Sequence, residues 1–412
     1  MQNDPASGPL AAWRINIVFV LVTTTLIGAV VAIGGYLVPA LAIATKESLG
    51  VDAAFIGYQV TLVFGFGGLS SLVSGGFVAR YGPCRVLQAS LLVSAVGCLL
   101  YGVPNKIVLT AGSVIIGASY GMTYPSASVL LTRFGSPDRL NFLFSFRQAS
   151  TSIGAVIAGL LGPFVAILWG WEWGFYLIAG ISICLVVAIN GLRPDWDDLA
   201  DPEFAISPPW AGVRLIFANR PLLMICGIGF GFSAVQVGVV AFLVLFLSED
   251  VGFSLSKGGI ALSLINLLGA TSRIFWGWRA DKLKNSMVVV IAMGAVTSTT
   301  IAVFAFANPD WPQWIIFGTL SFFGFATFGW SGIVMTNIVR RANPDNIAET
   351  VGGALGFMFS GAWVGPSVGA IILQLTSSYR AVFGFLFAAA LIATILALKS
   401  AFSGAGFPSG QT

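Results

Sequence analysis

The sequence predicts an all-α membrane protein in which twelve transmembrane helices form two bundles of six. Of its 412 residues, 57% are hydrophobic and only 9% are charged, a balance typical of membrane-spanning chains. Apolar stretches of about 20 residues, enough to cross about 30 Å of hydrocarbon as helix, recur along the chain. These stretches lack the alternating pattern of a membrane barrel, so helices are the structure that satisfies their backbone in lipid.

The apolar stretches define the predicted spans. Residues 1–12 carry one charge, Asp4, and no basic segment or clear cleavage site, so we expect the first span to stay as an anchor. The predicted spans are 14–42, 53–79, 86–104, 107–132, 141–168, 173–192, 221–247, 258–280, 286–307, 312–338, 350–375 and 380–400.

The positions of the basic residues predict that both termini are cytoplasmic. In that orientation four basic residues face the opposite side: Lys46, Lys106, Lys257 and Arg380. A larger group falls on the cytoplasmic side: Arg14, Arg80, Arg85, Arg133, Arg139, Arg193, Arg214, Arg220, Arg279, Lys282, Lys284, Arg340, Arg341 and Lys399. Because cytoplasmic loops are enriched in Lys and Arg, the net charge of +4 reports orientation and not nucleic-acid binding.

The residue types needed for an enzyme or a metal site are missing from the pattern. Cys84, Cys98, Cys184 and Cys226 have no ligand spacing, and histidine is absent. The glycines of "GFGFSAVQVG" lie within an apolar span and follow no strand, so they form no dinucleotide fingerprint. We therefore expect no catalytic residues, no metal and no cofactor.

A polar, proline-rich segment divides the chain into similar halves. We predict an N-terminal bundle at 1–192, a cytoplasmic linker at 193–220 and a C-terminal bundle at 221–412, with Asp195 to Glu203 as a solvated stretch. Several glycines recur at nearly constant separation, which indicates a duplicated six-helix unit. The pairs are Gly50 with Gly252, Gly57 with Gly259, Gly75 with Gly277, and Gly162-Pro163 with Gly365-Pro366.

This 6+6 pattern, with a basic signature after the second span of each half, resembles the major facilitator superfamily of secondary transporters over the whole chain. "GWRADKLK" keeps Gly277, Asp281 and Lys282 of the signature, although Lys284 stands where the family has glycine. "GGFVARYGPCR" keeps four of its members but has Ala79 in place of the acid. The first-half members are Gly75, Arg80, Gly82 and Arg85.

The resemblance implies that the signature residues latch one conformation of an alternating-access carrier. The signature acid normally caps a neighbouring helix end, so its replacement by Ala79 leaves the role of the first-half signature open. The six residues that we predict to form the latch are Gly75, Arg80, Arg85, Gly277, Asp281 and Lys282.

Three strings also resemble a bacterial group that includes permeases for small organic anions, with too many substrates for the resemblance to name one. The strings are "FSFRQASTSIGAVIAGLLGP", "SAVQVGVVAFLVLFL" and "FGWSGIV". We expect a monomer in a bacterial inner membrane.

Two charged residues fall inside predicted spans and cannot be placed in loops. Arg147 lies eight residues beyond Arg139, which is about 12 Å along a helix, and Arg273 lies six residues, about 9 Å, before Arg279. A charge at mid-membrane costs about 3 kcal/mol, so it needs a partner, water or a function. We expect both arginines to bind an anionic substrate, with carbonyl bonding or snorkelling to the interface as the alternatives.

Resemblance to monocarboxylate transporters and the oxalate/formate exchanger supports the role of Arg273. In those carriers an arginine four residues before a glycine binds the substrate carboxylate, and "RIFWG" has that spacing. The exchanger also has a lysine in its eleventh span, where this chain has Met358 and no positive charge. The resemblance therefore does not carry over a dianion held by both groups.

Uncharged polar and aromatic residues complete the predicted substrate site. Tyrosine combines a ring with a hydroxyl that can orient an anion, while the alternative for each residue is helix packing or bonding between helices. The predicted substrate-binding residues besides the arginines are Tyr36, Tyr120, Tyr124, Gln59, Gln236, Asn266 and Trp330.

No acidic residue lies at mid-depth, and Glu172 is expected at the interface among tryptophans. Facilitated diffusion, anion exchange and symport therefore stay open, with or without a co- or counter-ion. We expect a carrier of a small carboxylate or sulfonate. The alternatives are an exporter of amphipathic or neutral compounds and a non-transporting membrane sensor or assembly factor with a carrier fold.

Overall fold

The computed structural model describes residues 16–51, 53–206, 208–253, 255–283 and 285–402. The predictions for residues 1–12, Arg14 and Lys284 fall outside these ranges. Within them the regular structure is helical, and it forms two compact units. The first unit comprises Met1–Leu143, Ser150–Leu215 and Ala342–Gly356; the second comprises Phe144–Ala149, Ile216–Arg341 and Phe357–Thr412.

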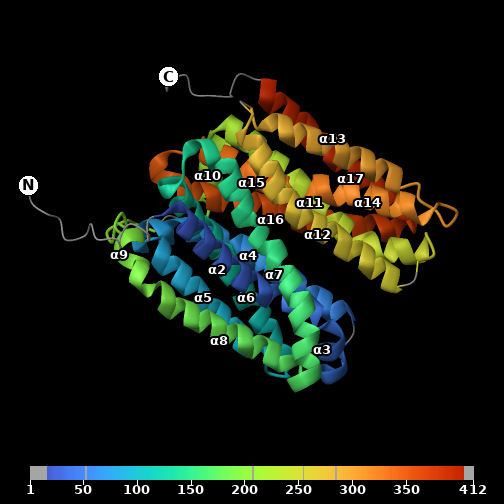
Figure 1. The fold of residues 1–412 in the computed structure, drawn as a ribbon, viewed down its shortest axis with the longest axis horizontal. Coiled ribbons are helices and arrows are strands. Elements are labelled where there is room, and N and C mark those ends of the chain that lie inside the picture. Colours follow the sequence, from blue (N-terminus) through green and yellow to red (C-terminus); the bar gives the residue numbers. More distant parts are fainter. Residues whose placement is uncertain (1–15, 52, 207, 254, 284, 403–412) are drawn as a thin grey trace, which may run out of the picture. The chain divides into compact units, whose positions relative to one another are not determined.

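The first unit is built from the early helices of the chain, which pack mainly on α6. In Figure 1 these helices run from blue to green; α4 and α5 both pack against α6, and α5 also packs against α8. The helices that begin in this unit are α2 (Ile17–Ala40), α3 (Ala42–Leu49), α4 (Ala53–Tyr81), α5 (Pro83–Tyr101), α6 (Lys106–Phe134), η1 (Pro137–Arg139), α7 (Leu140–Trp169), α8 (Trp171–Ile189), η2 (Asn190–Leu192), α9 (Arg193–Trp196) and α10 (Ala211–Ala218).

The second unit contains most of the remaining helices, packed around α11 and α17. Helix α17 packs on both α11 and α13, and α14 packs on α12 and α13. A core of buried aromatic side chains, including Phe246, Phe304 and Phe383, joins these helices. The helices that begin in this unit are α11 (Arg220–Glu249), α12 (Leu255–Asp281), α13 (Met287–Phe304), α14 (Gln313–Thr327), α15 (Trp330–Val339) and α17 (Tyr379–Phe402). Two further helices begin in the stretch Ala342–Gly356 of the first unit: η3 (Pro344–Asn346) and α16 (Ile347–Thr376), which continues into the second unit.

Two segments belong to a different unit from the residues on either side of them in the sequence. Phe144–Ala149 lies within α7 yet belongs to the second unit, and Ala342–Gly356, which includes the first turns of α16, belongs to the first. Each unit therefore draws residues from both predicted halves. The bundles 1–192 and 221–412 follow the covalent order of the helices and stay a prediction.

The prediction of twelve spans in an all-helical fold is confirmed. Twelve segments of the described chain are long and apolar enough to cross a membrane. Some helix starts differ from the predicted ones because local capping decides them. Helix α5, for example, begins at Pro83 and not at residue 86, since proline is favoured in the first helical turn.

The predicted span 312–338 is interrupted. Helix α14 ends at Thr327 and α15 begins at Trp330, with Phe328 and Gly329 in a turn between them. Neighbouring helices bond to this interruption. The Trp276 indole of α12 donates to the Phe325 carbonyl at 2.8 Å, and the Thr297 and Thr327 hydroxyls are 2.9 Å apart. Bonds of this kind satisfy polar groups where a membrane helix is irregular.

The predicted solvated stretch after α8 is partly docked on the first unit, and in this respect the prediction is wrong. Trp196 is 1% exposed, and the Asp201 amide donates to the Ala79 carbonyl at 3.0 Å. Leu199 and the side chains of residues 201–203 are exposed, as expected. Burial of the Trp196 ring anchors this acidic segment to the first unit, which its polar composition did not predict.

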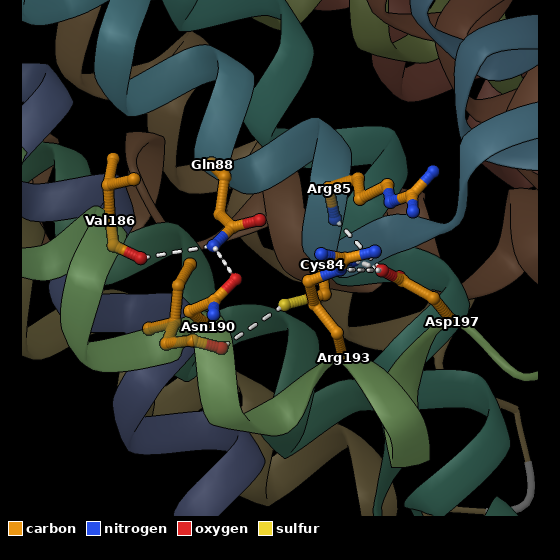
Figure 2. Close-up of polar contacts among 8 residues, drawn as sticks. Cys84, Arg85, Gln88, Val186, Asn190, Arg193 and Asp197 are labelled. Atoms are coloured by element: carbon orange, nitrogen blue, oxygen red, sulfur yellow. Dashed lines mark hydrogen bonds and ion pairs between the residues drawn. The ribbon is translucent and has the colours of Figure 1, made fainter.

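Asp197 caps the N-terminus of α5 from a distant point in the sequence (Figure 2). Its Oδ1 accepts the Cys84 amide at 2.7 Å and its Oδ2 accepts the Arg85 amide at 3.2 Å. Arg193 Nε lies 4.0 Å from Oδ2. The carboxylate thus satisfies two of the amides that a helix start leaves without intrahelical partners. Burial nevertheless raises the pKa of Asp197, against the opposing effect of these bonds.

Gly82 makes room for this cap. Its φ is +88°, a conformation that favours glycine, and a Cβ on it would come 2.5 Å from Asp197 Cγ. Gln88 of α5 adds bonds to the Val186 carbonyl at 3.0 Å and to Asn190 Oδ1 at 3.3 Å (Figure 2). The end of α8 and the start of α5 are therefore joined by several polar contacts.

A partly exposed ion pair holds the next residue. Arg133 Nη2 donates to Asp198 Oδ2 at 2.7 Å, and a second bond joins Nη1 and Oδ1. The Arg133 guanidinium holds the pKa of Asp198 below its usual value of 3.8. The side chains are 28% and 42% exposed, so solvent screens this pair.

We predict that Asp197→Ala lowers the stability of the protein by about 1 kcal/mol, because the two capped amides lose their acceptor. Asp197→Asn should cost less, since its amide oxygen still accepts one bond and the site already disfavours a charge. The midpoint of thermal unfolding in detergent checks both variants. Equal midpoints for Asp197→Ala and wild type would show that the cap contributes nothing.

We predict a smaller, salt-sensitive effect for Asp198→Asn, about 0.5 kcal/mol. A carboxylate whose folded-state pKa is lowered stabilises the fold above its unfolded pKa, and this contribution is lost as the pH falls through the folded pKa. The difference from wild type should therefore exist above pH 3.8, vanish on further acidification, and shrink in about 0.5 M NaCl. Unfolding midpoints over this pH range test it, and a difference that persists in acid contradicts it.

Candidate functional site

Arg273 is buried within the second unit and bonded to main-chain carbonyls. Its side chain projects from α12 and is 5% exposed. Nε donates to the Phe328 carbonyl at 3.2 Å, and Nη1 donates to the Gln148 carbonyl at 3.1 Å. The Phe328 ring centre lies 5.6 Å from Cζ, within range of a cation–π contact. This placement disagrees with snorkelling, because the guanidinium ends inside the protein and not at its surface.

Arg147 lies next to the residue that Arg273 contacts. It belongs to the segment Phe144–Ala149 of α7 and is 2% exposed. The bond from Arg273 to the Gln148 carbonyl places the main chain of residues 147–148 beside the Arg273 guanidinium. The structure thus places both predicted arginines in one unit, on helices α7 and α12, although they come from different halves of the sequence.

The backbone of this α7 segment also approaches α15 closely. Ser145 lies against Gly332, where an added Cβ would come 2.5 Å from the Ser145 amide nitrogen. Ser145 and Gln148 are three residues apart and so share one face of α7. One face of the segment therefore makes two contacts inside the second unit, one with α15 through packing and one with α12 through Arg273.

The three predicted tyrosines lie together in the first unit. Tyr124 and Tyr120 lie with their hydroxyls 2.7 Å and 3.1 Å from the Thr151 hydroxyl. Phe64 joins them to Tyr36, with its ring edge-on to both Tyr120 and Tyr36. Thr151 was not predicted from the sequence. The result is a cluster of hydroxyls and aromatic rings of the kind that can orient a polar ligand.

Gln59 is committed to a different network. It is 1% exposed, its Nε2 donates to Thr110 at 3.2 Å, and its Oε1 accepts from Ser113 at 2.6 Å. Tyr101 extends this chain to Ser113 at 2.6 Å. These bonds join α4, α5 and α6, which is the helix-bonding alternative raised for Gln59 from the sequence.

The remaining polar candidates lie in the second unit. Trp330 donates from its indole to Gln236 Oε1 at 3.2 Å and stacks on Phe232. Asn266 donates to the Leu262 carbonyl of its own helix. The structure thus joins Gln236 with Trp330, while the bond of Asn266 stays within α12.

Met358, which stands where the exchanger has lysine, also lies in the second unit. It packs against α11, where a Cβ on Gly229 would touch both Met358 and Trp330. An apolar side chain therefore borders the Trp330 ring at this position.

The first-half latch residues lie near α16 and the docked segment. A Cβ on Gly75 would come 2.5 Å from the Glu349 backbone, so α4 and α16 pack closely there. Arg80 lies 5.5 Å from the ring of Tyr81, and the Arg85 amide bonds to Asp197. Asp197 therefore supplies an acid beside a signature that has alanine at position 79. Sequence reasoning missed it because its partners lie more than a hundred residues away.

The second-half latch residues occupy the end of α12. Gly277 is buried, Asp281 is half-buried, and Lys282 places Nζ 3.8 Å from the Trp278 ring centre. The conformational role of all six latch residues stays a prediction.

Twelve candidate spans in the described residues, with the buried guanidinium of Arg273 bonded at a helix interruption, are typical of a helical membrane carrier. A family model described as "Major Facilitator Superfamily" matches residues 20–364. The chain belongs to this superfamily. It is a multi-pass membrane transporter with the alternating-access fold of the family.

The relatives of this chain are named for different cargoes. A "Probable hexose phosphate transport protein" of Chlamydia trachomatis is 24% identical over 85% of this chain and 84% of its own. A "Citrate-proton symporter" of Salmonella typhi is 24% identical over 82% of this chain and 83% of its own. The "Major facilitator superfamily multidrug transporter mfsC" of Aspergillus fumigatus is 24% identical over 72% and 57%. The subtype therefore does not follow from the family.

Solved structures show the same fold at low sequence identity. The transporter FucP in the outward conformation gives a TM-score of 0.74 at 13% identity, covering 96% of this chain and all of its own. The human organic anion transporter MFSD10 gives 0.72 at 15% identity, covering 95% and 100%. At these identities the likeness concerns the fold alone.

We predict that Thr151→Val destabilises the first unit by about 1 kcal/mol, because Tyr120 and Tyr124 lose a shared bonding partner at nearly constant volume. Thr151→Ser keeps the hydroxyl and serves as the matched control. Thermal unfolding in detergent should rank wild type and Thr151→Ser above Thr151→Val. Identical midpoints for the two variants would show that the hydroxyl has no structural weight.

Proposed function

We propose that this transporter carries a small organic anion bearing a carboxylate or sulfonate group. The observation that supports this most directly is the buried guanidinium of Arg273, with Arg147 beside its acceptor Gln148. Arginine stays protonated in proteins, and its planar fork matches a carboxylate or sulfonate with two parallel hydrogen bonds. A site with this charge attracts anions.

The surrounding helices supply little negative charge. Helices α7, α14 and α15 contain no acidic residue, and α12 contains only Asp281 at its last position. An anionic substrate would therefore complement the charge of the arginines in the transport path. A cationic substrate would lack a carboxylate partner on these helices.

A monoanion fits better than a dianion held by two separated cations. Helix α16 contains no Lys or Arg, and Met358 within it packs beside Trp330 and Gly229. An apolar body attached to one acidic group suits this apolar neighbourhood. The proposal therefore favours monocarboxylates or sulfonates, with the protein in a bacterial inner membrane.

The names of two relatives support an anionic cargo. The matches to proteins named for hexose phosphate and citrate each extend over more than four-fifths of this chain. Both names denote anions at neutral pH. The relative named for multidrug transport favours export of amphipathic compounds, and the test below separates the two functions.

We predict that lactate, benzoate or a related monoanion raises the unfolding temperature of the purified protein, while glucose does not. Arg273→Gln should weaken this binding by about 10- to 100-fold through loss of a charge-assisted pair, and Arg147→Gln should also weaken it. Arg279→Gln and Arg139→Gln are matched controls, because both arginines are exposed. Uptake of the radiolabelled anion into proteoliposomes should fall in the same order.

Unchanged uptake in both buried-arginine variants would refute the anion site. Stabilisation by hydrophobic drugs and by no acid would instead support the exporter. Absence of any flux, together with capture of a stable membrane or cytosolic partner, would support the sensor alternative.

A further inference from the structure

We infer that an anionic ligand and the Gln148 carbonyl compete for Arg273, so that anion binding releases residues Phe144–Ala149 of α7 from α12 and α15. The inference rests on the proposed function, because it takes the ligand to be the anion bound at Arg273. Arg273 would then have a second role besides binding the anion, because its bond to α7 would depend on whether the anion is bound.

The contacts of the segment show what would have to change. Arg273 Nη1 donates to the Gln148 carbonyl at 3.1 Å, and Ser145 packs on Gly332 from the same helix face. The Ser145 hydroxyl is buried and has no hydrogen-bond partner within the described residues. The Ser145 side chain therefore holds this contact by packing, while the bond from Arg273 is a polar tie.

The Phe328 and Gln148 carbonyls that Arg273 contacts are neutral, which makes each of them a weaker partner than a carboxylate. A carboxylate forms charge-assisted bonds with guanidinium that are about twice as strong as bonds to neutral carbonyls. A carboxylate seated end-on takes one N–H from Nη1 and one from Nη2, and Nη1 is the atom that now donates to Gln148. Binding of the anion in this way therefore favours loss of the Gln148 contact.

Release of the segment leaves α7 intact. The carbonyl of a residue within a helix also accepts the amide four residues later, so Gln148 keeps an acceptor role without Arg273. Residues 140–143 and 150–169 of α7 already belong to the first unit. Ligand binding would thus change the contacts of this short stretch with α12 and α15, and it would not require unfolding.

Thiol labelling at position 145 tests the inference. Cys184 is the exposed native cysteine, while Cys84, Cys98 and Cys226 are buried, so Cys184→Ser gives a background of low reactivity. In this background Ser145→Cys is labelled with N-ethylmaleimide in buffer, lactate, benzoate or glucose. Ser182→Cys, at a position that is 0% exposed in α8 of the first unit, is the matched control.

The anion that stabilises the protein should speed labelling of the Ser145→Cys variant by about 5-fold or more, as expected for a ligand-shifted equilibrium. Glucose should have no effect, and the Ser182→Cys variant should not respond to any of these compounds. Adding Arg273→Gln to Ser145→Cys should speed labelling without ligand and remove the response to the anion. Hydrogen–deuterium exchange of residues 140–152 in the unmodified protein makes the same comparison without a new thiol.

The two ideas fail in different ways. If an anion stabilises the protein but leaves both the labelling rate and the exchange unchanged, the competition is overturned and the proposed function stands. If Arg273→Gln leaves ligand-free labelling unchanged, the tie to α7 is overturned. If no anion stabilises the protein, the proposed function fails and the inference fails with it.

Discussion

A guanidinium buried among apolar helices must find hydrogen-bond acceptors, and the second unit is organised around this requirement. Arg273 finds them on the main chain, at Phe328 and Gln148. The first acceptor lies at the interruption between α14 and α15, and the second lies on α7, which packs closely against Gly332. The helix interruption and the close approach of α7 and α15 thus both supply acceptors for the Arg273 guanidinium, whose burial without acceptors would be costly.

The first unit solves a related problem with the opposite charge. A helix start presents amides without partners, and α5 receives an acceptor from Asp197 after α8. In the second half the corresponding acid, Asp281, lies within its own signature. The two halves, which the glycine spacing predicts to be copies of one unit, therefore have a carboxylate near a helix end at different positions in the sequence.

The sequence predicts features that depend on composition over long windows. The twelve spans follow because hydrocarbon thickness sets the length of an apolar helix, and burial of Arg147 and Arg273 follows from their place within such runs. The sequence does not predict contacts with main-chain atoms. Every residue has a carbonyl, so nothing in the residue type marks that of Gln148 as the acceptor. The cap by Asp197 and the Gln59 network depend on which helices meet, and helix period alone does not specify that.

The chain after α8 stays with the first unit almost as far as α11. The segment 193–220 was predicted as a cytoplasmic linker, whereas residues up to Leu215 belong to the first unit, and α11 begins at Arg220 with Asn219 as its cap. Gly212 lies in backbone contact with Glu349 and Gly353 of the same unit. Residues 216–218 continue α10 and Asn219 caps α11, so this crossing has no segment outside a helix or its cap, and it is one of several places where the chain passes from one unit to the other.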